Sequence, residues 1–246
     1  MSLFRILSLK GLAGRTGLGV RVAVVDTGVH AEHPHVGGIS GGVAIGADGD
    51  VGTDLVDRLG HGTAVAAAIR EKAPGVELLA VKVFDRRLVT TGRALVDGIT
   101  WSAARPVDLI NLSLGTCNQA HLPALAAAVA AADAHGAVVV AAAPQAGAAW
   151  LPGGLPGVVA VDVDWTCPRD ECHVRINDDG AVRVRASGYP RPIPGVPQEN
   201  NVSGLSFAVA NASGFLSLVI QPLPAQSVPP VRGLAALVAR LRDTPG

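Results

Sequence analysis

The sequence predicts an α/β fold: a doubly wound, mostly parallel sheet with helices on both faces. Short apolar runs rich in Val, Ile, Leu and Ala alternate with longer helical patterns, as in sheets built from strand–helix–strand units. The chain has 246 residues, 49 % of them hydrophobic, which is enough to bury one large core. We therefore expect a single domain over residues 1–246.

Several apolar runs have the length and composition of buried strands. They are Val20–Val25, Leu78–Phe84, Val107–Leu112, Ala137–Ala142 and Val158–Val161. The segments between them with helical patterns are Thr63–Ile69, Gly92–Ala104 and Leu122–His135. Each connection is long enough for a right-handed crossover, so we expect the strands that they join to be parallel.

After Val161 the pattern changes. His173–Ile176 and Ala181–Arg185 flank Asn177-Asp-Asp-Gly180, whose residues accept the backbone of a tight turn and so indicate a β-hairpin. A Pro-rich loop, Tyr189–Pro197, comes next. The remaining predicted elements are an apolar helix from about Ser206 to Ile220 and a final amphipathic helix, Val231–Arg242.

The composition excludes some classes of function. Charged residues make up 16 % of the chain and cancel formally, so nothing indicates nucleic acid or an anionic membrane as a partner. The longest apolar stretch, Phe207–Ile220, is too short to span a bilayer. The N-terminus has no signal-peptide pattern, and we expect a cytoplasmic protein.

Neither the cysteines nor the acidic residues indicate a metal site. Cys117, Cys167 and Cys172 are too few for a disulfide framework. Cys167-Pro-Arg-Asp-Glu-Cys-His173 contains zinc-ligand types at an unusual spacing, so a local disulfide or reduced thiols are favoured over zinc. The acidic run Asp48, Asp50, Asp54 and Asp57 does not fit a calcium loop. We expect no metal and no cofactor.

Three polar residues stand where an α/β sheet places its active site, beyond the carboxyl ends of the strands. Asp26 ends the first strand, His61 lies between Gly60 and Gly62 at a helix start, and Ser206 starts another helix. Each alone is typical of a turn or a helix cap. Their order along the chain, Asp, His, Ser, matches the subtilisin order of a catalytic triad.

The motifs around these residues resemble those of the subtilisin-like serine proteases, or subtilases. The resemblance covers about residues 15 to 220, and several separate motifs appear in the family's order. The motifs are Val24-Val-Asp-Thr-Gly-Val29 with His33-Pro34, Gly60-His-Gly-Thr63, Leu79–Phe84, Asp108–Gly115, Val138–Ala143, Gly157–Val161 and Gly204-x-Ser206-x-Ala208. This resemblance implies a three-layer, subtilisin-like α/β sandwich.

The resemblance also implies a serine endopeptidase. Ser206 is then the nucleophile, His61 the general base and acid, and Asp26 the group that orients the imidazole. Gln145 takes the place of the family's oxyanion-hole amide. The implied substrate is an extended peptide or protein segment that pairs with Ser113-Leu114-Gly115 and approaches the small residues Ala142 and Ala143.

The chain departs from the family at several positions. Pro144-Gln145 replaces Gly-Asn, so the oxyanion donor sits on a longer stem; in subtilisin itself, losing such a donor costs about 10²–10³ in turnover. Leu205 replaces a Thr before the nucleophile, and Ala64 replaces a second His found in many members. Only Arg70-Glu-Lys72 stands where calcium-stabilised members carry a longer loop. We also expect no propeptide.

Other functions remain open at this stage. Asp26-Thr-Gly28 is also the aspartic-protease signature, but that chemistry needs a second such loop, which the sequence lacks. A catalytically impaired, subtilase-like peptide-binding or partner subunit is one alternative. A transpeptidase or macrocyclase on the same fold is another. A dedicated substrate, such as a precursor peptide or one partner protein, is favoured over general degradation.

Overall fold

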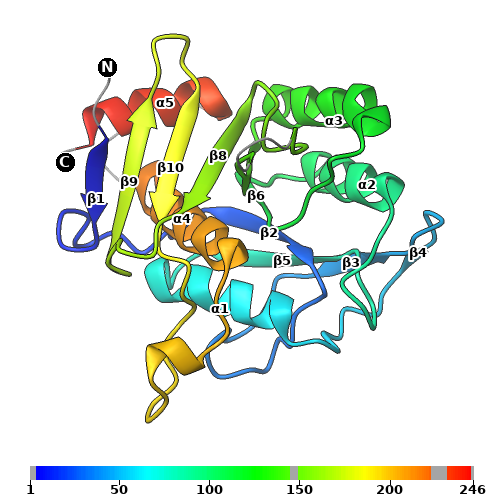
Figure 1. Ribbon diagram of the computed structural model, residues 1–246, viewed down its shortest axis with the longest axis horizontal. Coiled ribbons are helices and arrows are strands. Elements are labelled where there is room, and N and C mark those ends of the chain that lie inside the picture. The colour runs from blue at the N-terminus through cyan, green and yellow to red at the C-terminus, as the bar shows by residue number, and fades with distance from the viewer. Residues whose placement is uncertain (1–3, 145–148, 223–231, 245–246) are drawn as a thin grey trace.

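The computed structural model describes residues 4–144, 149–222 and 232–244. Its centre is a ten-stranded sheet in the order β1-β9-β10-β8-β7-β6-β2-β5-β3-β4 (Figure 1). The strands are β1 Arg5–Ser8, β2 Arg21–Asp26, β3 Gly42–Ile45, β4 Val51–Gly52, β5 Glu77–Lys82, β6 Leu109–Leu112, β7 Val138–Ala142, β8 Val158–Val163, β9 Glu171–Ile176 and β10 Val182–Ala186.

The strands from β10 to β3 in this order all pair in parallel. Antiparallel strands close both edges: β9 and β1 at one edge, and β4 at the other. The sheet is therefore mostly parallel, as the sequence predicts. Parallel strands of this kind need covering on both faces, because their residues are apolar on both sides.

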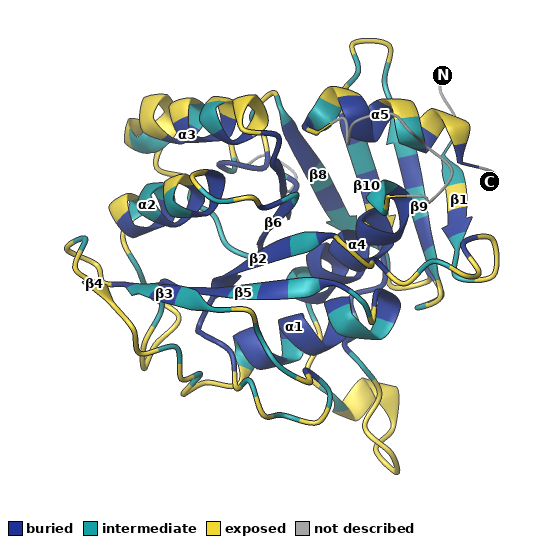
Figure 2. Cartoon of the chain, turned by 180° about the vertical axis from the view of Figure 1, so that it is seen from behind, coloured by how far each residue is buried: buried dark blue, intermediate teal, exposed yellow. Residues whose placement is uncertain are grey.

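Helices supply that cover in two layers. They are α1 His61–Lys72, α2 Gly92–Ala103, α3 Leu122–Ala134, α4 Leu205–Ile220 and α5 Leu234–Asp243, with short 3₁₀ turns η1 Gln119–His121 and η2 Gln198–Asn200. Side chains of α1, α4 and α5 join one apolar core, and those of α2 and α3 join the other. The sides of these helices that face the sheet are buried (Figure 2).

The predicted elements agree with the structure apart from their ends. The expected helix Thr63–Ile69 is longer, since α1 starts at His61 and continues to Lys72. The predicted hairpin forms between β9 and β10, with Gly180 at φ 83° in its turn. Residue 231, the predicted start of the last helix, lies outside the described residues, and α5 starts at Leu234.

The short strands at or next to the two edges, β1, β3 and β4, are not predicted from the sequence. β1 pairs with β9 through a register that joins Arg5 to Val174, residues far apart in the chain. β3 and β4 contain only a few residues each, too short for a clear alternation. Their partners, not their own composition, make them strands. Among the described residues no helix has the length and apolar character needed to cross a membrane.

Candidate active site

Asp26 is the last residue of β2 and lies in the middle of the sheet, between the ends of β5 and β6. Its side chain is buried, with 1 % of the residue exposed. One carboxylate oxygen, Oδ1, accepts the backbone N–H of Thr27 at 2.8 Å and lies 2.7 Å from Nδ1 of His61. A buried carboxylate with an imidazole partner can hold that ring in one orientation and favour its protonated form.

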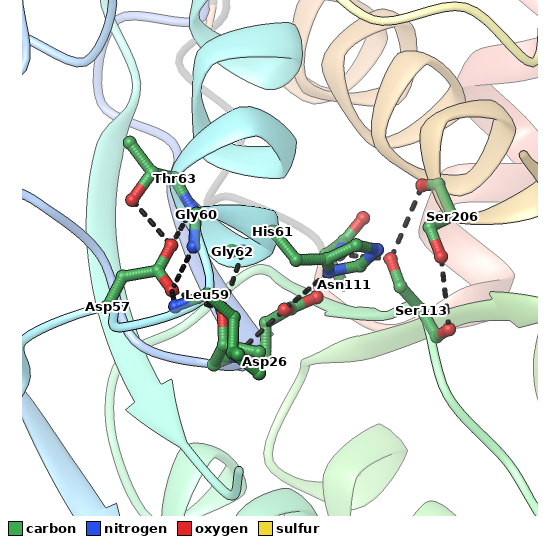
Figure 3. A network of polar contacts seen from close by, with 11 residues as sticks. Asp26, Asp57, Leu59, Gly60, His61, Gly62, Thr63, Asn111, Ser113 and Ser206 are labelled. Carbon is green, nitrogen blue, oxygen red and sulfur yellow. Dashed lines mark hydrogen bonds and ion pairs between the residues drawn. The ribbon is translucent and has the colours of Figure 1, made fainter. Parts of the chain in front are cut away.

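His61 is the first residue of α1 and is partly exposed. Its Nδ1 faces Asp26, so its Nε2 lies on the opposite side of the ring, toward Ser113 and Ser206 (Figure 3). Burial by itself lowers the pKa of the imidazole. The hydrogen bond and charge of Asp26, with the charge of Asp57, outweigh burial and raise that pKa above its ordinary value.

Asp57 organises the turn that leads into α1 (Figure 3). Its Oδ1 accepts from the hydroxyl of Thr27 and from the backbone N–H groups of Leu59 and Gly60, at 2.8, 3.0 and 2.8 Å. Its Oδ2 accepts from the N–H and the hydroxyl of Thr63, at 2.8 and 2.6 Å. Burial raises the pKa of Asp57, but these hydrogen bonds, those from Thr63 foremost, hold it below its ordinary value.

In the sequence Asp57 stands out only as part of an acidic run, and its role in shaping the turn is a finding of the structure. A signal was nevertheless present. A carboxylate a few residues before a helix start can accept the N–H groups that have no partner within the helix. The spacing from Asp57 to Gly60 and Thr63 in the sequence is consistent with this.

The two glycines beside His61 are required for different reasons: Gly60 for its backbone conformation and Gly62 for lack of space. Gly60 has φ 78°, a left-handed conformation that glycine adopts without the strain of a Cβ. Gly62 has no room for a side chain, since a Cβ there would lie 2.2 Å from the carbonyl oxygen of Gly28. Its N–H donates to the hydroxyl of Thr27 at 2.8 Å. The close approach of these two backbones brings His61 to Asp26.

Ser206 lies in the first turn of α4, a helix buried along most of its length. Its hydroxyl donates to the carbonyl of Ser113 at 3.5 Å, a long and weak contact. The hydroxyl of Ser113 donates to the carbonyl of Ser206 at 3.3 Å. Among the hydrogen bonds of the described residues, none joins Ser206 to His61. The next residue of α4, Phe207, contacts the His61 ring, with ring centroids 5.8 Å apart.

The start of α4 is held by hydrogen bonds to the preceding loop. The side-chain amide of Asn211 donates to the carbonyls of Ser187 and Tyr189, at 2.9 and 3.0 Å. The N–H of Gly204 donates to the carbonyl of Gly188 at 2.8 Å. These contacts fix the turn that carries Ser206, and no sequence pattern indicates them.

The predicted peptide-pairing segment lies directly after β6. Ser113, Leu114 and Gly115 are all partly exposed. Gly115 packs closely on the segment after residue 149, since a Cβ on it would lie 2.4 Å from the Leu151 carbonyl oxygen and 2.4 Å from Nε1 of Trp150. The following residue, Thr116, exchanges two backbone hydrogen bonds with Leu151, both 2.8 Å long.

Ala142 and Ala143, the other predicted substrate contacts, are buried at the end of β7. A Cβ on Gly153 would lie 1.7 Å from the carbonyl oxygen of Ala142, so the segment around Gly153 covers this strand end. The predicted oxyanion donor, Gln145, lies outside the described residues. Its role therefore stays a prediction.

The structure also shows the surroundings of the acidic run and of the cysteines. Asp54 pairs with Arg58 at 2.7 Å, while Asp57 is held by the hydrogen bonds described above. Cys167 and Cys172 are buried, Cys117 is exposed, and all three are free thiols. Within the described ranges, no group of three or more His, Cys, Asp or Glu side chains is arranged to hold a metal ion.

Comparisons with known proteins agree with this architecture. Residues 17–158 match the Subtilase family, Peptidase S8. The chain is 30 % identical to subtilisin DY of Bacillus licheniformis, over 94 % of this chain and 88 % of that protein. A cold-adapted subtilisin-like serine proteinase has a similar structure, with a TM-score of 0.67 and 23 % identity over 92 % of this chain and 82 % of the other.

A lanthipeptide protease also has a similar fold, with a TM-score of 0.64 and 19 % identity over 92 % of this chain and 90 % of the other. These likenesses define the class of fold as that of the subtilisin-like serine proteases. The chain belongs to the subtilase family, since the family match covers more than half of its length.

Proposed function

We propose that this protein is a serine endopeptidase that cleaves peptide bonds through Asp26, His61 and Ser206. The observation that carries the proposal is the 2.7 Å contact between a buried carboxylate and an imidazole whose free side faces a helix-start serine (Figure 3). Separate parts of the chain supply these groups, and Asp26 lies at the carboxyl end of a central strand of the sheet. Membership of the subtilase family supports the same chemistry.

In the proposed reaction Ser206 Oγ bonds to the carbonyl carbon of the substrate while its proton passes to Nε2 of His61. Collapse of the tetrahedral intermediate breaks the C–N bond, and the same proton passes to the leaving nitrogen. Water then attacks the acyl-enzyme by the same route. Asp26 holds the imidazole of His61 in place and balances the positive charge that the imidazole gains.

The Ser206 hydroxyl must turn from the Ser113 carbonyl toward His61 for this reaction. The 3.5 Å contact that it leaves is weak. Rotation of a hydroxyl-bearing side chain between staggered positions is a small change, and hydrogen bonds in substrate-free enzymes often tighten only when substrate binds. The side-chain amide of Gln145 and the N–H of Ser206 are the proposed oxyanion donors.

The same 3.5 Å contact favours one second candidate, a subtilase-like subunit that binds extended peptides without cleaving them. In that case the Ser206 hydroxyl stays on Ser113. The fold is unaffected by this choice, and only the reactivity of Ser206 differs between the two functions.

A fluorophosphonate that modifies activated serines tests the proposal. We expect one label per chain on Ser206, loss of labelling in Ser206→Ala and in His61→Ala, and full labelling in Ser203→Ala, a matched control on the exposed loop just before α4. Labelling that persists in Ser206→Ala contradicts the proposed nucleophile. An unlabelled wild-type chain that still binds peptides supports the second candidate.

The substrate forms a separate part of the proposal. We propose a dedicated peptide or protein, bound in extended form along Ser113–Gly115. Mass spectrometry of a peptide library after incubation identifies the cleaved sequences and distinguishes hydrolysed products from ligated ones. Cleavage restricted to a few related sequences supports a dedicated substrate, whereas cleavage at most sequences contradicts it.

A further inference from the structure

A cavity of about 540 Å³ lies beside the candidate active site, between α1 and the loop after Tyr189. Such a volume is in the range of pockets that take small ligands or a few side chains. The α1 side presents Thr63, Ala64 and Ala67, and the loop side presents Ile193 and Val202. In Figure 1 this loop, which carries η2, extends past α1, and Figure 2 shows that it is exposed.

The walls of the cavity are largely apolar and open to solvent. Ile193 is 47 % exposed and Val202 is 60 % exposed, although both are aliphatic. On the opposite wall Ala64 and Ala67 are too small to fill the space between helix and loop. Exposed apolar side chains on one wall of a cavity are typical of a binding site, since covering them with a ligand removes apolar surface from water.

The cavity lies next to the turn that carries His61, and part of its lining comes from the loop that leads to Ser206. Gly60 and Thr63, on either side of His61 in the sequence, contribute to its lining. Asn201 and Val202, which also line it, lie a few residues before Ser206. The cavity therefore lies on the His61 side of the candidate site, because Gly60 is bonded directly to His61.

The proposed reaction indicates which segment of the substrate, the acyl segment or the leaving segment, lies beside the cavity. The protonated imidazole must donate to the leaving nitrogen, so the leaving segment departs on the His61 side of the cleaved bond. The acyl segment lies on the other side, along Ser113–Gly115. We infer that this cavity binds a large apolar side chain from the leaving segment of the substrate, C-terminal to the cleaved bond; this inference rests on the proposed function.

The polar groups around the cavity argue against two other occupants. His30, His33 and His35 line it, yet in the described residues no three such side chains are arranged to hold a metal ion. Burial lowers the pKa of His35, and the positive charges of Arg191 and His33 lower it further. Arg191 in the lining would repel a lysine or arginine side chain, and the carboxylate of Asp57, which also lines the cavity, already accepts hydrogen bonds from Thr27, Leu59, Gly60 and Thr63. A leucine or phenylalanine side chain would meet no such repulsion.

Two peptides that share one acyl segment and differ only in the leaving segment test this inference. One carries leucine at a single leaving-side position and the other carries serine there, and the pair is repeated at each of the first four positions. We expect kcat/KM to be about tenfold higher for leucine at one position or more, as expected when one aliphatic side chain is buried.

Variants then connect this preference to the cavity. Ile193→Asp and, independently, Val202→Asp should reduce the leucine-to-serine ratio of kcat/KM to about one, because a carboxylate replaces part of the apolar wall. Val196→Asp is the matched control: Val196 is on the same loop, is 39 % exposed, and is not among the residues that line the cavity. It should leave the ratio unchanged.

A peptidyl nitroanilide, which has no leaving peptide segment, separates this inference from the proposed function. Absence of nitroanilide turnover and of fluorophosphonate labelling in the wild-type chain would count against the proposed function itself. Turnover of the nitroanilide with equal rates for leucine and serine at all four positions overturns only the cavity inference. So does a leucine preference that both Ile193→Asp and Val202→Asp retain.

Discussion

Asp57 accepts hydrogen bonds from both the N–H and the hydroxyl of Thr63, two residues after His61. The Thr63 hydroxyl also accepts the backbone N–H of His30 at 3.0 Å. One carboxylate thus joins the first turn of α1 to the loop that follows Asp26 and Thr27. The position of His61 depends on this network as well as on its direct contact with Asp26.

Replacing Asp57 should therefore impair activity without touching a reacting group. In Asp57→Asn one acceptor oxygen becomes an NH₂ group that faces N–H donors. We expect a loss of at least about 1.5 kcal/mol in unfolding free energy, the scale of one hydrogen bond to a charged group. We also expect kcat/KM to fall about tenfold or more, because the imidazole is held less firmly.

Asp54→Asn is the control for that variant, since Asp54 is exposed and makes its ion pair with Arg58 outside this network. Urea unfolding and peptide hydrolysis measure the two quantities. Equal effects from both substitutions would show that Asp57 acts only through its charge.

The pH dependence of activity should follow the imidazole of His61. Only its neutral form can take a proton from Ser206, so activity is present above the pKa of His61 and is lost as pH falls through it. Because Asp26 and Asp57 raise that pKa, the loss should centre above the ordinary histidine value of about 6.5. The pH profile of kcat/KM measures it.

A substitution at Asp26 checks the cause of that shift. Asp26→Asn removes the charge and should lower the pKa of His61, which NMR titration of the ring in the Ser206→Ala background reports directly. Asp48 is exposed and lies outside the contact between Asp26 and His61, so Asp48→Asn should leave the pKa of His61 unchanged. A His61 pKa that is the same in both variants contradicts the role given to Asp26.

Gly62 should tolerate no side chain. In Gly62→Ala the new Cβ would meet the carbonyl oxygen of Gly28 at 2.2 Å, so the two backbones must separate. We expect a loss of about 1–3 kcal/mol in unfolding free energy, the usual cost of overpacking, and weaker activity because His61 moves from Asp26. Gly52→Ala is the control, since no atom lies within 4 Å of its Cβ position. A fully stable and active Gly62→Ala variant would disprove the close approach.

The three thiols should differ in reactivity. Cys117 is exposed, whereas burial raises the pKa of Cys167 to about 11 and also raises that of Cys172. Alkylation of the native chain near pH 8 should modify Cys117 alone, because the thiolate is the reactive form. Cys117→Ser should then abolish native labelling.

Unfolding the chain in denaturant without a reductant completes that experiment. Uptake of three alkyl groups shows that Cys167 and Cys172 are reduced. Uptake of only one would indicate a disulfide between them and would contradict the free thiols of the structure. Native modification of Cys172 would contradict its burial.

The groups of the candidate site could be located in the sequence through local signals. Asp26 ends an apolar strand, and His61 and Ser206 stand at the starts of apolar helices, but their roles were predicted from their order along the chain and from the motifs that resemble those of the subtilases. The network around Asp57 was missed because its donors come from Thr27, Leu59, Gly60 and Thr63, and side-chain directions in a turn cannot be read from composition. The edge strand β1 was missed because its partner, β9, lies far along the chain.

The sequence by itself determined the α/β class, the order of most strands and helices, and the three candidate reacting residues. The reason is that apolar periodicity and short motifs are local properties of the sequence, and the three reacting residues lie in motifs that resemble those of the subtilases. Only the tertiary structure decided that the Asp26 carboxylate lies 2.7 Å from His61, and that the loop after Tyr189 lies opposite α1 across a cavity. Those relationships depend on which strands pair and how closely Gly62 approaches Gly28, and these are properties of the packed chain.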